Sequence, residues 1–84
     1  MTYGIIIQPR AERDLRSLGP DIRNRIVDKV RGLENNPRPR GVIKVKGRDE
    51  YRLRVGDYRV LYTIDDNSRT VFIERAGHRR EIYG

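Results

Sequence analysis

Several residue types that build common functional sites are absent or rare in this 84-residue sequence. It contains no cysteine and no tryptophan, and it has a single histidine, His78. The lack of cysteine excludes a disulfide framework and a thiolate metal site, and one imidazole cannot form a histidine-rich metal centre. No hydrophobic run approaches a membrane span, and the N-terminus lacks a signal-peptide pattern. We therefore expect a cytoplasmic protein with no metal and no cofactor.

Basic residues outnumber acidic ones, and the excess is uneven along the chain. Nineteen lysines and arginines against twelve aspartates and glutamates give a net charge of +7. Residues 1–37 hold seven basic and five acidic side chains, whereas residues 38–84 hold twelve and seven. Arginine dominates the second half, and its planar guanidinium suits bidentate phosphate contacts. This distribution favours a polyanionic partner over the alternative of a merely well-solvated basic surface.

The hydrophobic pattern predicts a single α+β domain over residues 1–84. The expected elements are a strand at 3–8, helices at 10–18 and 20–35, a short strand at 42–47, a hairpin within 50–66 and a last strand at 70–76. Gly77 permits a sharp turn after the last strand. The helical hairpin should cover one face of a four-stranded, mostly antiparallel sheet, in the order β-α-α-β-β-β. The charged face of the second helix is mixed in sign, and we assign no function to it.

The stretch from Glu50 to Asp66 contains two alternating runs around Gly56-Asp57, a strong signal for a tight β-hairpin. With a two-residue loop, one face carries Tyr51, Leu53, Val55, Tyr58, Val60, Tyr62 and Ile64, and the other carries Arg52, Arg54, Arg59 and Leu61. Arg54 then lies opposite Arg59, and like charges in that position destabilise a sheet. An anion-binding site explains this pair better than packing does. The simpler alternative is the alternation of any half-exposed antiparallel sheet.

These motifs together resemble the RelE/ParE superfamily of bacterial and archaeal toxins, and most closely the RelE-type messenger-RNA endonucleases. The resemblance covers nearly the whole chain, through the helical hairpin broken at Leu18-Gly19 and the runs 51–54, 56–62 and 77–83. It implies a toxin that cleaves messenger RNA in the ribosomal A site without a metal. It also implies a cognate antitoxin as partner, which we expect to be acidic and partly disordered.

The resemblance implies a set of catalytic side chains around one phosphate. The catalytic set is Arg52, Arg54, Arg59, Arg79, Tyr83 and His78, and the RNA-binding set is Lys44, Lys46, Arg48 and Arg80. The first three arginines line the scissile phosphate, and Arg79 supports the leaving group or the phosphate, with Arg80 as its competitor. Tyr83 stacks on the nucleotide or activates it, or else it is only a hydrophobic plug.

The general base stays open. Several relatives have lysine at the positions of Arg52 and Arg54, and arginine holds its proton up to a pKa of about 12.5 or above. Other members of the family use a glutamate and a histidine, for which Glu81 and His78 are the candidates here. The alternative for His78 is a turn residue that hydrogen-bonds the backbone. Unlike some relatives, the chain is expected to lack a C-terminal helix that could act as a lid.

Two other functions fit the same sequence. One is a ParE-like protein that inhibits DNA gyrase by binding, and the other is an inactive RNA- or ribosome-binding module. The ParE branch shares the fold but generally lacks the clustered basic residues and the terminal tyrosine. We therefore prefer the endonuclease.

Overall fold

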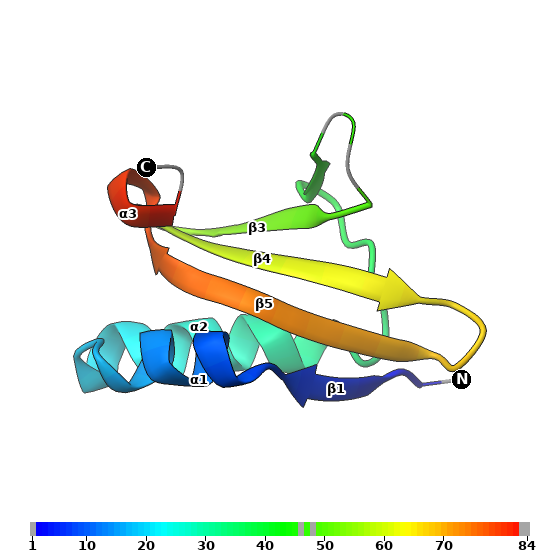
Figure 1. Cartoon of the computed structure of the whole chain (residues 1–84), viewed down its shortest axis with the longest axis horizontal. Coiled ribbons are helices and arrows are strands. Elements are labelled where there is room, and N and C mark those ends of the chain that lie inside the picture. The colour runs from blue at the N-terminus through cyan, green and yellow to red at the C-terminus, as the bar shows by residue number, and fades with distance from the viewer. Residues whose placement is uncertain (1, 46, 48, 83–84) are drawn as a thin grey trace.

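The computed structural model describes residues 2–45, 47 and 49–82, which form a sheet with two helices on one of its faces. The strands are β1 (Gly4–Ile7), β2 (Ile43–Lys44), β3 (Tyr51–Val55), β4 (Tyr58–Asp65) and β5 (Thr70–His78), and the helices are α1 (Pro9–Arg16), α2 (Pro20–Gly32) and α3 (Arg79–Ile82). The strand order is β1-β5-β4-β3-β2. β1 is parallel to β5, and the other neighbouring pairs are antiparallel (Figure 1).

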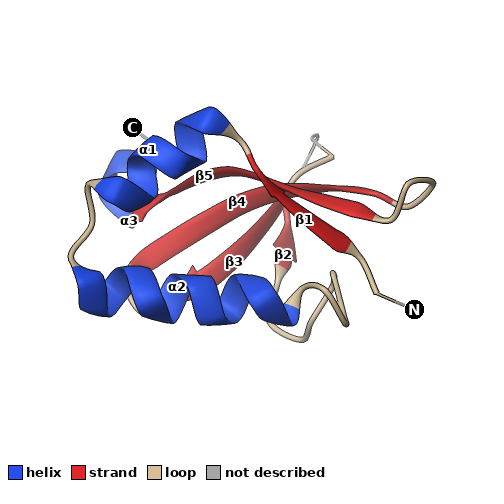
Figure 2. Ribbon diagram, turned by 90° about the horizontal axis from the view of Figure 1, so that it is seen from below, coloured by secondary structure: helices blue, strands red, loops and turns tan. Residues whose placement is uncertain are grey.

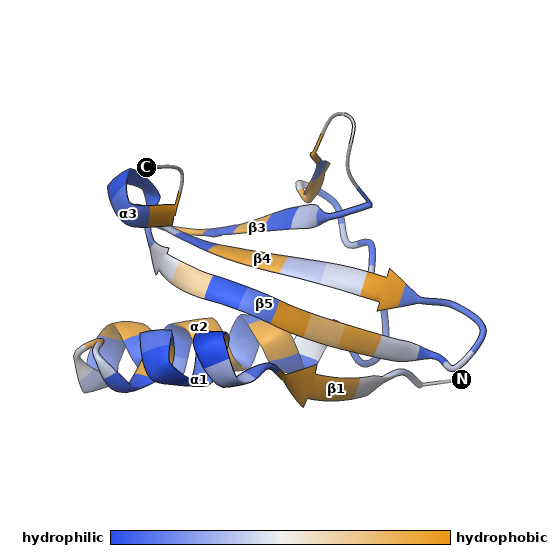
Figure 3. Cartoon of the chain, in the orientation of Figure 1, coloured by the Kyte–Doolittle hydropathy of each residue, from blue (hydrophilic) through white to orange (hydrophobic). Residues whose placement is uncertain are grey.

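Helices α1 and α2 form a hairpin whose apolar stripes pack on the sheet (Figure 2). Each helix has a proline in its first turn, where the missing N–H costs no helical hydrogen bond. The buried cluster contains Ala11, Leu15, Ile26, Val30, Leu33, Leu53, Val55, Val60, Tyr62, Val71, Ile73 and Ala76. Burying one large aliphatic side chain contributes about 1.5–3 kcal/mol, so this cluster is the main stabilising feature of the domain. In Figure 3 hydrophobic residues accordingly recur along β1, β4 and β5. None of the described helices is long and apolar enough to cross a membrane.

The β3–β4 hairpin has the register predicted from the sequence. Val55 pairs with Tyr58, Arg54 with Arg59, and the remaining pairs follow in step. Gly56 has φ +60°, a left-handed conformation that a two-residue hairpin loop requires and that glycine adopts without strain. The register is set by burial, because a slip of one residue would turn the apolar face toward solvent.

The sheet has five strands, one more than expected. The segment predicted at 42–47 pairs with β3 through Ile43 and Lys44, and so it adds a two-residue edge strand. The helices are shorter than expected, with α1 ending at Arg16 and α2 at Gly32. Neither difference changes which face of the sheet the helices cover.

The C-terminal part of the chain differs more from the prediction. The last strand does not stop at 76, because β5 continues to His78 and Gly77 pairs with Arg59. The expected turn at Gly77 is therefore wrong. The chain turns one residue later and forms the single helical turn α3, where no helix was predicted. A Cβ at Gly77 would lie 3.5 Å from the side chain of Ile82, so α3 folds back over this glycine.

Asp14 attaches α1 to β5 beyond the end of β1. The pairing of β1 with β5 ends at Ile7 and Ile73. Further along β5, the Ala76 N–H donates to Asp14 Oδ2 at 3.0 Å, and Arg75 Nε donates to the same oxygen at 2.8 Å. The carboxylate thus satisfies a strand N–H that has lost its neighbouring strand. It also neutralises Arg75.

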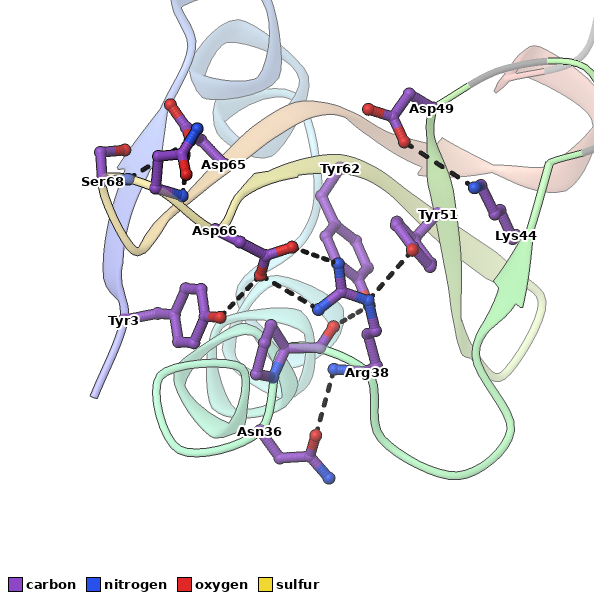
Figure 4. A network of polar contacts seen from close by, with 12 residues as sticks. Tyr3, Asn36, Arg38, Lys44, Asp49, Tyr51, Tyr62, Asp65, Asp66 and Ser68 are labelled. Atoms are coloured by element: carbon purple, nitrogen blue, oxygen red, sulfur yellow. Dashed lines mark hydrogen bonds and ion pairs between the residues drawn. The ribbon is translucent and has the colours of Figure 1, made fainter. Parts of the chain in front are cut away.

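Arg38 fixes the linker that follows α2 (Figure 4). Its guanidinium donates to Asp66 Oδ1 at 3.2 Å and to Asp66 Oδ2 at 2.9 Å, and its Nε donates to the Tyr51 hydroxyl at 3.0 Å. The Tyr3 hydroxyl donates to Asp66 Oδ1 at 2.7 Å. The hydrogen bonds from Arg38 and then Tyr3 lower the pKa of the Asp66 carboxyl. This network ties the linker to the N-terminal segment, to β3 and to the turn after β4.

Tyr62 provides a second, buried attachment for the same linker. Its hydroxyl donates to the carbonyl oxygen of Pro37 at 2.7 Å, and its ring stacks on Tyr51 with 5.6 Å between centroids. Burial raises the pKa of the Tyr62 phenol above its usual value of about 10.

We expect the free energy of unfolding to fall as the pH rises above about 10, and Tyr62→Phe to reduce that fall. The folded state holds the phenolic proton more tightly than the unfolded chain. The contribution is therefore fully present below the unfolded pKa and is lost as the pH rises through the folded one. At neutral pH the free energy of unfolding of Tyr62→Phe should be lower by about 1–3 kcal/mol, because the Pro37 carbonyl loses the hydrogen bond from Tyr62.

Urea unfolding across the alkaline range measures both effects. Tyr58→Phe is the matched control, because the Tyr58 hydroxyl makes no hydrogen bond within the described chain. If the free energy of unfolding fell equally with pH in the wild type and in Tyr62→Phe, the alkaline loss of stability would not come from Tyr62.

Candidate nucleic-acid interface

Five arginines from three elements line one depression of about 500 Å³ on the face of the sheet opposite to α1 and α2. The lining residues are Gly41, Ile43, Arg52, Arg54, Arg59, Arg79 and Arg80. We call this site the arginine depression. β3 and β4 supply three of the arginines because alternate residues of a strand share a face. The other two come from α3, which lies at the top of Figure 1 on the side away from α1 and α2.

Short-range contacts place α3 beside the hairpin. Ile82 is 9% exposed and packs over Gly77, which gives the helical turn one apolar anchor. The N–H of Arg79 donates to the carbonyl oxygen of Asp57 at 3.0 Å, so the first residue of α3 is attached to the loop between β3 and β4. The exposed side chains of Arg79 and Arg80 are thereby held next to the arginines of the sheet.

Arg59 is the most buried cation of the arginine depression, at 9% exposed. Its Nη1 donates to the carbonyl oxygens of Gly56 and Tyr58 at 3.1 and 3.0 Å. The guanidinium therefore stabilises the hairpin turn and carries its charge into the depression. Arg54, directly opposite on β3, is exposed.

Four of the five cations of the arginine depression contrast with other arginines of the domain. The ion pairs formed among the described residues are Arg16–Glu12, Arg38–Asp66, Lys44–Asp49 and Arg75–Asp14. None of them involves Arg54, Arg59, Arg79 or Arg80. The positive charge of these four arginines, which folding has gathered and which no described ion pair neutralises, favours the binding of an anion.

His78 does not join the arginine depression. Its ring packs edge-on against Tyr58, with 5.4 Å between centroids, and Tyr58 packs on the core. Successive strand residues point to opposite faces, so His78 and the adjoining Gly77, which pairs with Arg59, face opposite sides. His78 Nδ1 accepts a hydrogen bond from the Arg80 N–H at 3.2 Å. Such a hydrogen bond to the backbone fits the alternative role given for His78 above, that of a turn residue.

The remaining predicted residues fall into two groups. Lys44 pairs with Asp49 at 3.9 Å and does not line the arginine depression. Tyr83, Lys46 and Arg48 lie outside the described residues. The roles suggested for all four stay predictions.

Sequence reasoning missed the contribution of the linker after α2. Gly41 and Ile43 line the arginine depression, and Gly41 has φ +92°, a left-handed conformation that suits glycine. No role was predicted for residues 38–41. No local pattern shows that Arg38 and Tyr62 hold it against the sheet, because those contacts join residues far apart in sequence.

The fold and the matches with known proteins define the class of this protein. The family model described as "ParE toxin of type II toxin-antitoxin system, parDE" matches residues 5–83. Toxin RelG of Mycobacterium tuberculosis is 37% identical over 99% of this chain and 98% of its own length. The putative toxin RelE1 of Methanocaldococcus jannaschii is 30% identical over 99% and 97%. A chain of the toxin-antitoxin complex RelBE2 from Mycobacterium tuberculosis superposes with a TM-score of 0.84 and 33% identity, over 94% of this chain and all of that one.

These matches show that the protein is a toxin of a type II toxin-antitoxin system. Within that class, the chain belongs to the ParE toxin family of the RelE/ParE superfamily, and it is RelE-like.

We expect Arg54→Gln to raise the free energy of unfolding by about 0.5 kcal/mol at low salt, because it removes one of two like charges that face each other. The gain should shrink at about 1 M salt, where screening is strong. Urea unfolding at both salt concentrations measures the change. Arg23→Gln, which alters the net charge equally but lies on α2 outside the arginine depression, is the control. No gain over this control at low salt would contradict the expectation.

Proposed function

We propose that this toxin is an endoribonuclease that cleaves messenger RNA in the ribosomal A site. The observation that carries the proposal is the convergence of Arg52, Arg54, Arg59 and Arg79 on one depression. Membership of a family of toxins and the likeness to RelE toxins support it.

The proposed reaction needs charge stabilisation above all. The ribose 2′-oxygen forms a bond to the adjacent phosphorus, and the bond from phosphorus to the 5′-oxygen breaks. The products are a 2′,3′-cyclic phosphate and a 5′-hydroxyl. Negative charge increases on the phosphoryl oxygens in the transition state, and guanidinium groups already in place stabilise it without reorganisation. We assign Arg52, Arg54 and Arg59 to the phosphate and Arg79 to the phosphate or the departing 5′-oxygen, with Arg80 beside it.

The 2′-hydroxyl proton needs an acceptor other than arginine, because a guanidinium keeps its proton at neutral pH. The departing 5′-oxygen takes up one proton, from that protonated acceptor or from water, to become the 5′-hydroxyl. His78 lies on the opposite face, so the proposal leaves it outside the chemistry. Glu81 Oε2 lies 3.9 Å from the position that a Cβ would take at Gly77, opposite Arg59. We therefore keep Glu81 as the candidate acceptor. Among the described residues no three His, Cys, Asp or Glu side chains cluster to hold a metal, so the proposal uses the cations of the chain itself.

Tyr83, Lys44, Lys46 and Arg48 enter the proposal through the resemblance alone. A tyrosine ring can stack on a base whatever the sequence of the RNA, and a contribution of about 1–3 kcal/mol is typical for such stacking. The three basic residues would contact the phosphates on either side of the cleaved bond.

We expect Arg79→Ala to lower messenger cleavage by about 100-fold or more, the usual effect of removing one donor to a developing charge. The measurement is the mapping of 5′-hydroxyl RNA ends on programmed ribosomes. Arg23→Ala, with the same net charge, should cleave like the wild type. Arg59→Ala is a less specific test, because Arg59 also stabilises the hairpin turn. Undiminished cleavage by folded Arg79→Ala would contradict the assignment.

One alternative has an observation in its favour, because the matching family model carries the ParE name. It is a toxin that inhibits DNA gyrase by binding. A wild-type protein that blocks gyrase supercoiling while translated messages stay intact would replace the endonuclease by this function. Binding to ribosomes without new RNA ends would indicate an inactive RNA-binding module instead.

We also propose an antitoxin whose acidic segment covers the arginine depression. RelBE2 is a complex of a toxin with its antitoxin, and a net charge of +7 attracts an acidic chain. A short acidic protein encoded by an adjoining reading frame should bind this toxin and abolish cleavage. Titration calorimetry should show weaker binding by Arg79→Ala and Arg54→Ala than by Arg23→Ala. A partner that binds all three variants equally and leaves cleavage intact would refute this.

A further inference from the structure

A second basic depression, of about 720 Å³, lies between helix α2 and strand β3. Four cations from three elements line it: Arg25 and Lys29 of α2, Arg40 of the linker and Arg54 of β3. We call it the α2 depression. Its lining includes one carboxylate, Asp28, which forms no ion pair among the described residues.

The hairpin turn lies next to both the α2 depression and the arginine depression. Arg25 and Lys29 are four residues apart, so they share one face of α2. Arg25 reaches the turn, where its Nη2 lies 3.6 Å from the position that a Cβ would take at Gly56. The carbonyl oxygen of the same glycine accepts from Arg59. A guanidinium therefore lies beside this turn in each depression.

The two depressions adjoin at the edge of β3. Gly41 and Arg54 line both of them. Among the described residues, β2 pairs with β3 at Tyr51 and Arg52 and not beyond, so the edge of β3 near Arg54 is not covered by a strand. An extended polyanion can therefore pass from one depression to the other without crossing a paired strand.

The cations of the α2 depression form no described ion pair with any carboxylate. The sequence pattern of α2 alone indicated a solvated face of mixed sign. Folding changes this, because Arg40 and Arg54 from other elements join Arg25 and Lys29 and leave the lining with four positive charges against one negative. Like charges gathered in one hollow favour a bound anion.

We propose that the α2 depression binds the phosphate backbone of RNA that continues around β3 from the arginine depression. The proposal rests on the proposed function, because it takes RNA to occupy the arginine depression. Three of the four cations of the α2 depression are guanidinium groups, which suit bidentate contacts with phosphate. Because Gly41 and Arg54 line both depressions, the two hollows lie side by side, which favours one extended chain with a charge on every unit. The backbone can belong to the messenger itself or to ribosomal RNA, and the chemistry is the same.

The test compares two double variants of α2 with equal net charge. Arg25→Gln/Lys29→Gln removes two cations of the α2 depression, and Arg23→Gln/Arg31→Gln removes two cations of the same helix outside it. Arg54 is left unchanged because it belongs to the proposed catalytic machinery. Urea unfolding first shows that both variants fold. The probes are 2′-O-methyl oligoribonucleotides, in which the attacking hydroxyl is blocked, and empty ribosomes.

For a 12-nucleotide probe, log K falls as log salt rises, and this negative slope should become shallower by about 1.4 in Arg25→Gln/Lys29→Gln. That change is about 0.7 for each lost phosphate contact. A 3-nucleotide probe, which fits the arginine depression alone, should bind this variant and the wild type equally. A reduced slope with the long probe assigns the α2 depression to the messenger. A loss confined to ribosome binding assigns it to ribosomal RNA.

The proposal is overturned if both double variants match in slope and in ribosome affinity. It is also overturned if Arg25→Gln/Lys29→Gln loses affinity only for the antitoxin, because the α2 depression would then bind an acidic peptide. Failure of the proposed function is seen separately: the wild type would give no new 5′-hydroxyl RNA ends on programmed ribosomes, whatever the α2 variants bind.

Discussion

The register of the β3–β4 hairpin is the constraint on which the rest of the structure depends. Burial of Leu53, Val55 and Val60 stabilises that register by about 1.5–3 kcal/mol for each side chain. The facing charges of Arg54 and Arg59 oppose it by about 1 kcal/mol at most. Because burial outweighs repulsion, the hydrophobic core holds two cations together that would otherwise separate. An anion that binds between them removes the remaining penalty.

Attachments outside the hairpin complete the site. The Arg79 N–H and the apolar contact of Ile82 hold α3 over the end of the sheet, and the Arg38 network holds the linker against β3. The arginines that attach structure, such as Arg38 and Arg75, are neutralised by carboxylates. In the two depressions, cations from separate elements lie together, and no ion pair among the described residues involves Arg25, Lys29, Arg40, Arg54, Arg59, Arg79 or Arg80. Arg59 combines both properties, because it stabilises the hairpin turn through two carbonyl oxygens and forms no ion pair among the described residues.

Much of this arrangement could be predicted from local patterns. The alternation around Gly56-Asp57 predicted the hairpin, its register and the shared face of three arginines, and the structure confirms the register. The fold class was also correct, although β2 adds a fifth strand. The errors lie where local signals are weak. Gly77 suggested a turn, yet pairing with Arg59 keeps it in β5 and moves the turn to the next residue, so His78 faces Tyr58.

The sequence by itself determined the elements, the core stripe and the charge excess, because these depend on spacing within short segments. Tertiary structure alone decided which cations share a hollow. Arg25 lies on the helix face to which the sequence assigned no function, and Arg40 lies between two predicted elements. Both join Arg54 in one depression only after α2 packs against the sheet. It also decided that Arg79 joins Arg59 while His78 does not. Packing between segments that are distant along the chain decides which of these residues become neighbours. A local sequence pattern does not contain that information.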